Sequence, residues 1–332
     1  IEAVWELSLA SMGEAIAAAR VREVAAIGLS VHGEAVTPVD ASLRPLRPTI
    51  LGMDTRTQAQ NAWLRERFGA QALFERTGMP IHTINTLPKL LWIREHEPDV
   101  WAAADRFLLV EDFLIARLTG QPAISTCLAS RTQLFDLEAG GWSGEILDAL
   151  ELEPERLAEI APSGTLVGRL SAELTERVGL SSAPGVVTGG HDQACGALGV
   201  GLTEPGLAMV STGTAEVVEV AMGSPVVSPP LDEGHISSYR ATVPELYLAM
   251  TLNHSGGLAL RWFRDGFCEP QVAGATESVD DAYDLILGGA TADPTGLLVL
   301  PHFAGAGTPT FDTASKGAIL GLTFSTTRTD LA

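Results

Sequence analysis

The chain has 332 residues, of which 46% are hydrophobic and 19% charged, and it carries a formal net charge of −20 with a sequence pI near 4.6. This composition is that of a packed globular protein and excludes a disordered one, and the length suggests about two domains. The strong negative charge gives no long-range attraction to DNA, RNA or anionic lipid, so we expect neither nucleic acid nor a membrane as a partner.

The cysteines and the apolar runs bear on the cellular compartment. Cys127, Cys195 and Cys268 lie far apart, and neither CxxC nor HExxH occurs, which argues against a disulfide framework and a structural zinc site. No apolar run approaches the ~18 residues that span a bilayer, and no signal peptide opens the chain. The sequence therefore predicts a cytoplasmic protein, and no residue is assigned as a metal ligand.

The first half of the chain alternates predicted helices and short strands. Apolar residues at steps of three and four predict a helix over residues 1–20, and a continuously apolar run predicts a buried parallel strand over 24–30. A turn-rich segment between residues 35–39 and 48–51 indicates a hairpin-like excursion. The further elements are a helix ended by Gly69, a helix over 86–96 with Pro88 in its first turn, a strand over 107–110, a helix over 111–118 ended by Gly120, and a mostly helical and loop-like stretch over 141–180.

The second half begins with turn-forming residues at 181–184, followed by a new buried strand. We interpret this segment as a domain junction, which gives domains of residues 1–184 and 185–332. The further elements are strands over 207–210, 215–221, 235–239, 247–251 and 297–300, the last of them buried, and helices over 257–263 and from residue 328 onward.

The stretch 184–196 holds the strongest candidate for chemistry. Val186 and Val187 end a buried strand, two glycines then let the backbone turn tightly and approach a ligand, and a helix begins at Asp192. A carboxylate is thereby placed at the carboxyl end of a strand and the amino end of a helix, where open α/β sheets bind ligands and anions are stabilised. A second interpretation is that Asp192 only caps the helix, and this stretch alone does not decide between the two.

Other candidate residues also follow predicted strands, and each has an ordinary structural alternative. His32 could donate to a substrate oxygen or be a satisfied structural histidine, and Glu34 could bind a polyol or be a solvated loop carboxylate. Asp54 could be a ligand or a helix cap. The loop 211–214 could present amides and hydroxyls to a phosphate or be an ordinary hairpin turn. Neither a GxGxxG fingerprint nor a Walker loop occurs.

Four segments resemble the motifs of one family. Residues 86–96 are similar to its first signature, and residues 316–322 to the beginning of its second. Residues 189–193 are similar to the segment that holds its catalytic aspartate, and residues 213–214 to a phosphate-contacting Gly-Thr pair. The family is that of the FGGY carbohydrate kinases, which includes glycerol kinase and xylulokinase, and the resemblance runs along nearly the whole chain.

The resemblance implies an α/β fold of two actin- and hexokinase-like (ribonuclease H-like) domains with a cleft between them, both incomplete here. It implies transfer of the γ-phosphoryl group of ATP, with Mg²⁺, to a sugar or polyol hydroxyl, and it is compatible with a homodimer. Asp192 would be the base that takes the hydroxyl proton. The other implied site residues are Glu34 and Gln193 as holders of substrate hydroxyls, His32, Gly33 and Asp54 at neighbouring substrate positions, and Gly213, Thr214, Gly305 and Gly307 at the nucleotide phosphates.

The sequence departs from the resembled family at several substrate positions. Where glycerol kinase has an arginine before its substrate glutamate this chain has Gly33, and where glycerol kinase has tryptophan and tyrosine walls it has Gly52 and Ile84. Xylulokinase places histidine where Glu34 stands, whereas the loop 304–307 is nearer the glycerol kinase pattern. Without the cationic clamp and the two large walls the pocket is enlarged, so we expect a longer polyol or a ketose and not glycerol.

The resemblance also implies segments that this sequence does not contain. The family's opening strand, with its Asp-x-Gly-Thr phosphate loop, would precede Ile1, and its glycine-rich adenosine loop would follow Ala332. We therefore expect a fragment that binds ATP poorly and turns over little. Two other functions stay open: a catalytically silent sugar-binding or regulatory protein on the same fold, and a nicotinamide-dependent oxidoreductase, which the lack of a glycine fingerprint disfavours.

Overall fold

The computed structural model describes residues 1–268, 283–284, 286–290, 293–312 and 314–332. Contacts divide this part of the chain into two compact units, the first made of Ile1–Met209 with Glu219–Ala249 and the second of Val210–Val218 with Met250–Ala332. The residues that follow Pro184 thus belong to the first unit, whereas the sequence suggested a division after this proline. The domain boundary at 184 itself stays a prediction.

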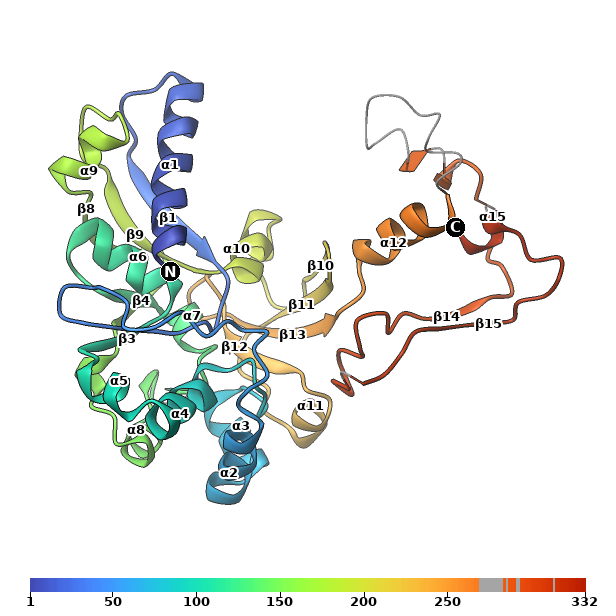
Figure 1. Cartoon of the computed structure of the whole chain (residues 1–332), viewed down its shortest axis with the longest axis horizontal. Coiled ribbons are helices and arrows are strands. Elements are labelled where there is room, and N and C mark those ends of the chain that lie inside the picture. The colour runs from blue at the N-terminus through green and yellow to red at the C-terminus, as the bar shows by residue number, and fades with distance from the viewer. Residues whose placement is uncertain (269–282, 285, 291–292, 313) are drawn as a thin grey trace. The chain divides into compact units, whose positions relative to one another are not determined.

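A three-stranded sheet in the order β1-β9-β8 carries the residues of interest in the first unit (Figure 1). β1 (Ala26–Val31) and β9 (Gly185–His191) run parallel, and β8 (Leu166–Arg169) is antiparallel to β9. Helix α6 (Val110–Thr119) packs against all three strands. The remaining elements of this unit are α1 (Glu2–Ala19), β2 (Thr37–Val39), α2 (Gln58–Phe68), α3 (Ala70–Thr77), α4 (Thr86–His96), α5 (Pro98–Ala103), β3 (Arg106–Leu108), β4 (Ala123–Ser125), α7 (Thr126–Ala129), β5 (Phe135–Asp136), β6 (Gly141–Trp142), α8 (Gly144–Leu150), the 3-10 helix η1 (Pro154–Arg156), β7 (Glu159–Ala161), α9 (Ala172–Arg177), α10 (Asp192–Gly199), α11 (Pro229–Glu233) and β12 (Ser237–Arg240).

The helices predicted in the first half are confirmed. α4 has the predicted bounds, and α2 ends at Gly69 and α6 at Gly120, where Gly120 takes the left-handed conformation that suits glycine. The hairpin-like excursion is also present, with a bridge between Val36 and Ile50. The stretch 141–180 was predicted as mostly helical and loop-like, but it also contains β6, β7 and β8. These strands are two to four residues long, which is too short for alternation to be read from the sequence.

Two hydrophobic clusters fill the first unit. One gathers around α6, where Phe113 and Ile115 are fully buried together with Trp5 and Leu9 of α1. The other gathers around α4, which is buried along most of its length. Residues 86–91 of α4 are all buried, so a charged residue in this part of the helix must find partners inside the protein.

The expectation that the strand after α1 is buried on both faces is wrong. In β1 only Val31 is buried, and Ala26, Gly28 and Ser30, which share one face, are exposed. In the same way β14 (Leu298–Leu300), predicted to be buried, is exposed along its length and pairs with β15 (Ala318–Leu320) in a two-stranded sheet. An apolar run shows that a strand tolerates burial, but whether other elements cover it depends on tertiary packing.

The two glycines before Asp192 do not form the tight turn that the sequence suggested. Both lie within β9, where the pairing with β1 shifts register between Gly28 and Ser30. A β-carbon on Gly189 would lie 1.6 Å from the carbonyl oxygen of Leu29, and one on Gly190 would lie 2.6 Å from Cγ2 of Thr242. Glycine is therefore required here because backbone and side chains approach β9 too closely for any β-carbon.

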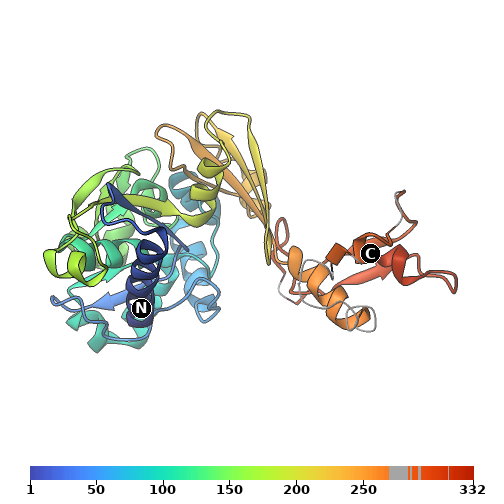
Figure 2. The same cartoon turned by 90° about the horizontal axis from the view of Figure 1, so that it is seen from above.

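A second sheet follows the strand order β10-β11-β13-β12 and confirms the strands predicted for the second half. Its new strands are β10 (Ala208–Thr212), β11 (Glu216–Met222) and β13 (Tyr247–Asn253). The second unit also contains α12 (Gly257–Phe267), drawn in orange, the red strands β14 and β15, and α15 (Arg328–Leu331) (Figure 2). α15 starts with a capping box between Thr327 and Asp330, as its sequence predicted. None of the helices in the described part of the chain combines the length and apolar composition that a bilayer crossing requires.

Replacing Gly189 by alanine is expected to lower the free energy of unfolding by at least about 3 kcal/mol, because the new methyl group cannot fit beside the Leu29 carbonyl. Gly196 of α10 is the matched control. A β-carbon there meets no atom within 4 Å, so Gly196→Ala should stabilise the helix by about 0.5–1 kcal/mol. Urea unfolding followed by circular dichroism measures both, and equal effects of the two substitutions would contradict the close β1–β9 approach.

Candidate functional site

The parallel pairing of β1 and β9 brings several of the predicted site residues to one sheet edge. Val31 at the end of β1 pairs with His191 at the end of β9. The segment 32–34 therefore leaves the sheet beside residues 192–193. This confirms that both segments lie at carboxyl ends of neighbouring parallel strands, the edge at which α/β sheets place ligands.

Asp192 is the first residue of α10 and its side chain is 47% exposed. His191 occupies the N-cap position, so Asp192 is not the capping residue that the alternative interpretation proposed. One carboxylate oxygen accepts a hydrogen bond from the backbone N–H of Gln193 at 2.7 Å and lies 3.4 Å from Nε2 of His191. The carboxylate is thus fixed near the helix amino end, where its charge is favourable, and it stays open to solvent.

His191 is buried and packs directly against Gly33. A β-carbon on Gly33 would lie 2.8 Å from Cδ2 of His191, so the imidazole occupies the space that a side chain at position 33 would need. The ring also meets Tyr239 edge-on at 6.1 Å between centroids. Burial, and then the nearby Arg131 guanidinium, lower the pKa of His191 to about 4, so the ring is neutral at physiological pH. His32, by contrast, is exposed.

Glu34 is a buried carboxylate held on both its side chain and its backbone. Its Oε1 accepts hydrogen bonds from Nε of Arg131 at 2.7 Å and from Nη2 of the same guanidinium. Its carbonyl oxygen accepts from Nζ of Lys89 at 2.9 Å and from the Thr86 hydroxyl at 3.2 Å. These bonds hold the backbone of Glu34 at φ 63°, a conformation that L-residues seldom adopt.

The charge state of Glu34 follows from these contacts. Burial alone would raise the pKa of Glu34, but Arg131, His191 and Lys89 together lower it below its ordinary value. Glu34 is therefore ionised at neutral pH. The sequence left open whether Glu34 is a solvated loop carboxylate, and the structure excludes this, since its side chain is only 4% exposed.

Arg131 is a site residue that the sequence reasoning missed. It is buried at 2% exposure and lies in the segment after α7, nearly a hundred residues from its partner Glu34. It also donates to the Ser237 hydroxyl at 3.2 Å and lies over the Tyr239 ring at 4.6 Å, and Tyr239 in turn donates to Glu219. No local pattern marks an arginine for burial, so this partner could be found only from tertiary structure.

Lys89 lies in the segment that resembles the family's first signature, and the sequence analysis assigns it no role. It is fully buried and also donates to the Ile84 carbonyl. Burial lowers the pKa of Lys89 to about 8, against the opposing effect of Glu34 and Asp54, so the group is still largely protonated at neutral pH. A single lysine within the otherwise apolar run 87–93 is the signal that indicates a buried cation.

Glu111 supports β9 at the register shift and is another residue that no sequence motif indicates. Its Oε1 accepts from the backbone N–H of Gly189 at 2.6 Å, and its Oε2 accepts from the N–H and the hydroxyl of Ser125 at 2.9 and 2.7 Å. Burial raises the pKa of Glu111, and these three hydrogen bonds oppose that rise. The carboxylate thereby satisfies a strand N–H that lies where β9 falls out of register with β1.

Asp54, predicted as a substrate contact with a helix cap as the alternative, is engaged by Arg56. Its two carboxylate oxygens accept from Nε and Nη2 of Arg56 at 2.9 and 2.7 Å. The N-cap of α2 is Thr57, so the capping alternative does not hold. The hydrogen bonds from Arg56 lower the pKa of Asp54. Whether this carboxylate contacts a substrate stays a prediction.

In the second unit, Gly213 and Thr214 form the turn between β10 and β11 and are tied to the start of α12. The carbonyl of Gly213 accepts from the N–H of Gly257 at 2.6 Å, and that of Thr214 accepts from Gly256 at 3.0 Å. A β-carbon on Gly256 would lie 2.5 Å from the carbonyl of Ala215. The segment is therefore a turn between two strands, as one interpretation of the sequence predicted, and it is also hydrogen-bonded to the start of α12.

Gly305 and Gly307 lie in a loop that packs on the end of β13. Gly305 has a φ of 89°, and a β-carbon on Gly307 would lie 1.9 Å from the carbonyl of Leu252. The next residue, Thr308, donates its N–H to the same carbonyl at 2.8 Å. Since α12 begins a few residues after β13, the second unit gathers both predicted phosphate loops around the end of this strand.

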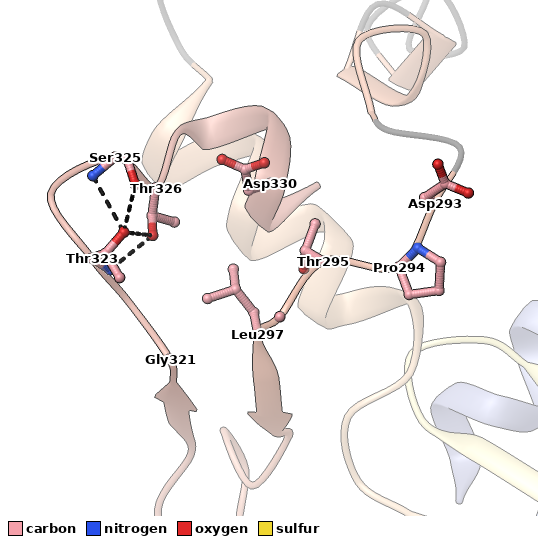
Figure 3. A pocket seen from close by; sticks show the side chains of 10 residues that line it. Asp293, Pro294, Thr295, Leu297, Gly321, Thr323, Ser325, Thr326 and Asp330 are labelled. Atoms are coloured by element: carbon pink, nitrogen blue, oxygen red, sulfur yellow. Dashed lines mark hydrogen bonds between the residues drawn. The ribbon is translucent and has the colours of Figure 1, made fainter.

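A separate pocket of about 500 Å³ lies in the second unit, at the ends of β14 and β15 near α15 (Figure 3). Hydroxyl groups line part of it, and Thr323 hydrogen-bonds to Ser325 at 2.8 Å and to Thr326 at 3.3 Å. Its acidic side chains are Asp293 and Asp330, the latter engaged in the capping box. None of the site residues predicted from the sequence lines this pocket.

The chain matches two family models, the N-terminal domain of the FGGY family of carbohydrate kinases over residues 1–199 and the C-terminal domain over residues 208–332. A protein named Xylulose kinase from Lactococcus lactis is 32% identical over 301 residues, which are 91% of this chain and 58% of that protein. A protein named Gluconokinase from Bacillus subtilis is 26% identical over 307 residues, 92% of this chain and 59% of that protein.

Solved structures match over nearly the whole chain. A structure described as a xyloylose kinase from Brucella ovis has a TM-score of 0.81 and 30% identity, over 96% of this chain and 63% of that chain. A ligand-bound xylulose kinase from Lactobacillus acidophilus has a TM-score of 0.86 over 99% of this chain and 65% of that one, and at 21% identity it shows the fold alone. The chain spans about three-fifths of the length of the curated relatives that it matches.

Replacing Glu111 by glutamine is expected to lower the free energy of unfolding by about 1–3 kcal/mol, because an amide group cannot accept all three hydrogen bonds from Gly189 and Ser125. Glu138 is exposed and serves as the matched control, since Glu138→Gln should leave stability within about 0.5 kcal/mol. Chemical unfolding measures both variants. A Glu111→Gln protein as stable as the control would show that this carboxylate does not support β9.

Burial of neutral His191 predicts a pH dependence of stability. The unfolded chain takes up a proton on this residue near pH 6.5, whereas the folded state does so only near pH 4. The unfolded state therefore binds more protons in this window, and stability falls by up to about 3 kcal/mol as the pH is lowered from 6.5 to 4. His191→Asn should flatten this slope and His96→Asn, at an exposed position, should not, as measured by urea unfolding at several pH values.

Proposed function

The chain belongs to the FGGY family of carbohydrate kinases, and we propose that the complete gene product transfers the γ-phosphoryl group of ATP to a hydroxyl of a sugar or polyol. The observation that carries this proposal is the pair of carboxylates at one sheet edge. Asp192 is half-exposed at the end of β9, and Glu34 is buried and ionised just after the end of β1. One carboxylate is open to take a proton, and the other is fixed to orient the group that gives it.

In this proposal Asp192 is the general base. An ionised carboxylate at a helix amino end can accept the proton of the attacking hydroxyl while the nucleophile forms its bond to phosphorus. Glu34 and Gln193 hold other hydroxyls of the same substrate, with His32 and Gly33 beside them at the same edge. His191, neutral and packed against Gly33, keeps the segment after β1 and the start of α10 in fixed contact.

The glycine-bearing loops of the second unit are proposed to bind the nucleotide phosphates. Phosphoryl transfer depends on positioning and on neutralising charge at the phosphate oxygens. The loop with Gly213 and Thr214 is hydrogen-bonded to the start of α12, and the loop with Gly305 and Gly307 is hydrogen-bonded to the end of β13. Such binding needs fixed backbone of this kind. These loops are candidates because glycine lets a phosphate approach the backbone closely.

Mg²⁺ is part of the proposal through its usual mode of binding. Within the described ranges no three His, Cys, Asp or Glu side chains are grouped to hold a metal ion. Mg²⁺ usually keeps several waters and binds substrate phosphate oxygens with few protein ligands, so its binding here does not require a cluster of carboxylates. When bound with ATP, the ion would neutralise charge on the phosphate oxygens.

The finer substrate assignment rests on the relatives and on the composition of the site. Relatives named for xylulose and for gluconate both match this chain, so a neutral ketose and an aldonate are the two substrate classes that their names suggest. With Gly33, Gly52 and Ile84 at the site we propose a xylulokinase-like activity on a pentulose, hexulose or longer polyol. A cytoplasmic location and a homodimer belong to the same proposal.

A catalytically silent sugar-binding protein is the second candidate function. The buried Arg131–Glu34 pair would equally support sugar binding without chemistry. The exposed carboxylate of Asp192 favours the kinase, because a binding protein has no need of an open base at this edge. Heat released on sugar binding, without any formation of ADP, would support the silent protein.

Replacing Asp192 by asparagine in the complete gene product should reduce sugar-dependent ADP formation by at least about 100-fold, because the general base is lost. Folding should be retained, since the side chain is half-exposed and asparagine keeps its shape. Asp148→Asn, at an exposed position on α8, is the matched control and should leave turnover unchanged. A coupled ADP-release assay with a panel of pentuloses, hexuloses and polyols measures both, and unchanged turnover of the Asp192 variant ends the assignment of this base.

A further inference from the structure

The hydrogen bonds of Arg131 to Glu34 go to one of its two carboxylate oxygens, and this asymmetry bears on which substrates the site accepts. Two hydrogen bonds from the guanidinium, one from Nε and one from Nη2, go to Oε1 of Glu34. Arg131 itself is 2% exposed and is engaged on its other side by Ser237 and Tyr239. The cation is thus bound by protein groups, and these two bonds go to Oε1 and not to Oε2 of Glu34.

The space at Gly52 lies next to that second oxygen, Oε2. A β-carbon on Gly52 would lie 3.8 Å from Oε2, 3.7 Å from the carbonyl oxygen of Gly33 and 3.6 Å from Cγ1 of Ile84. The space that a side chain at position 52 would fill is thus bordered by two oxygen atoms and by the apolar side chain of Ile84. A ligand group placed against these oxygens must donate hydrogen bonds, and hydroxyl groups do so whereas a carboxylate does not.

The other charged groups next to Glu34 reinforce this preference. Lys89 is fully buried and directs two of its N–H groups to the carbonyl oxygens of Glu34 and Ile84. His191 is buried between Gly33 and Tyr239 and carries no positive charge at neutral pH. At the same sheet edge Asp192 adds a second negative charge, which is open to solvent. A substrate carboxylate would therefore meet two carboxylates at this edge.

We propose that the Arg131-anchored Glu34 makes this site selective for neutral polyhydroxy substrates, ketoses and polyols, over aldonates. Arg131 is the positioning residue for this selectivity, since it fixes Glu34 and leaves Oε2 to accept a substrate hydroxyl. The inference rests on the proposed kinase function for its location, but it concerns recognition and can be tested by binding alone. It chooses between the two substrate classes that the relatives leave open.

The first test compares matched substrates on the complete gene product. Neutral ketopentoses, ketohexoses and polyols are compared with aldonates of five and six carbons, by ADP release and by titration calorimetry on the Asp192→Asn variant. We expect the best neutral substrate to exceed every aldonate at least 100-fold in kcat/KM and at least 10-fold in affinity. An aldonate that binds as tightly as the best neutral ligand overturns the inference. Selective binding without turnover supports the inference while the kinase proposal fails.

The second test asks whether Arg131 acts through Glu34. Glu34→Gln and Arg131→Met should each raise KM for the best neutral substrate about 10-fold or more, with a smaller change in kcat. Each should also lower the ratio of kcat/KM for that substrate to kcat/KM for the best aldonate. If the two residues act as one unit, the double variant should be no worse than the worse single variant. Arg22→Met, at an exposed position, is the control and should change neither constant.

Arg131→Lys is a second variant that tests the same role if Arg131→Met does not fold. Lysine keeps the positive charge but lacks the planar fork that donates twice to Oε1, so its KM effect should be intermediate while its thermal unfolding stays close to that of the parent. Additive effects of Glu34→Gln and an Arg131 variant, or discrimination against aldonates that survives both substitutions, would overturn the role given to this pair.

Discussion

The parallel contact between β1 and β9 is the constraint on which the site depends. At Gly189 the two strands approach so closely that the carbonyl of Leu29 occupies the place of a β-carbon. The pairing shifts register there, and the Gly189 N–H donates to the carboxylate of Glu111 on α6. Beyond this contact the two strands end side by side, since Val31 at the end of β1 is paired with His191 at the end of β9. Glu34 and Asp192, which follow these strand ends, therefore lie at the same edge of the sheet.

Buried charge is the second feature of this edge. Moving an arginine and a glutamate out of water costs several kcal/mol for each ion, and the loss is offset only when geometry and further hydrogen bonds are good. Arg131 and Glu34 meet this condition with two hydrogen bonds to one oxygen and with Lys89 and Thr86 on the Glu34 backbone. Such a pair contributes little net stability, but it fixes the orientation and ionisation of the one carboxylate oxygen left for a ligand.

In the second unit, close backbone contacts at glycines fix the predicted phosphate loops, whereas in the first unit a buried ion pair fixes the site. Gly256 and Gly307 lie where the carbonyls of Ala215 and Leu252 exclude a β-carbon. The segment before α12 thus packs on the turn between β10 and β11, and the loop after β14 packs on the end of β13. Glycine has a structural cost in conformational entropy, and its use at these positions is explained by packing whether or not a phosphate binds there.

The sequence by itself determined the helices, most of the strands and the family, because these depend on local periodicity, turn residues and contiguous motifs. It located Asp192 and Glu34 at strand ends for the same reason. Only the tertiary structure decided that Gly189 and Gly190 serve packing and not a turn, and that one face of β1 and the whole of β14 are exposed. It also decided that Arg131, Lys89 and Glu111 hold the site. Arg131 lies 97 positions from Glu34, and no local pattern encodes a contact of that range, since the two residues meet only when separate elements pack and water is excluded from both.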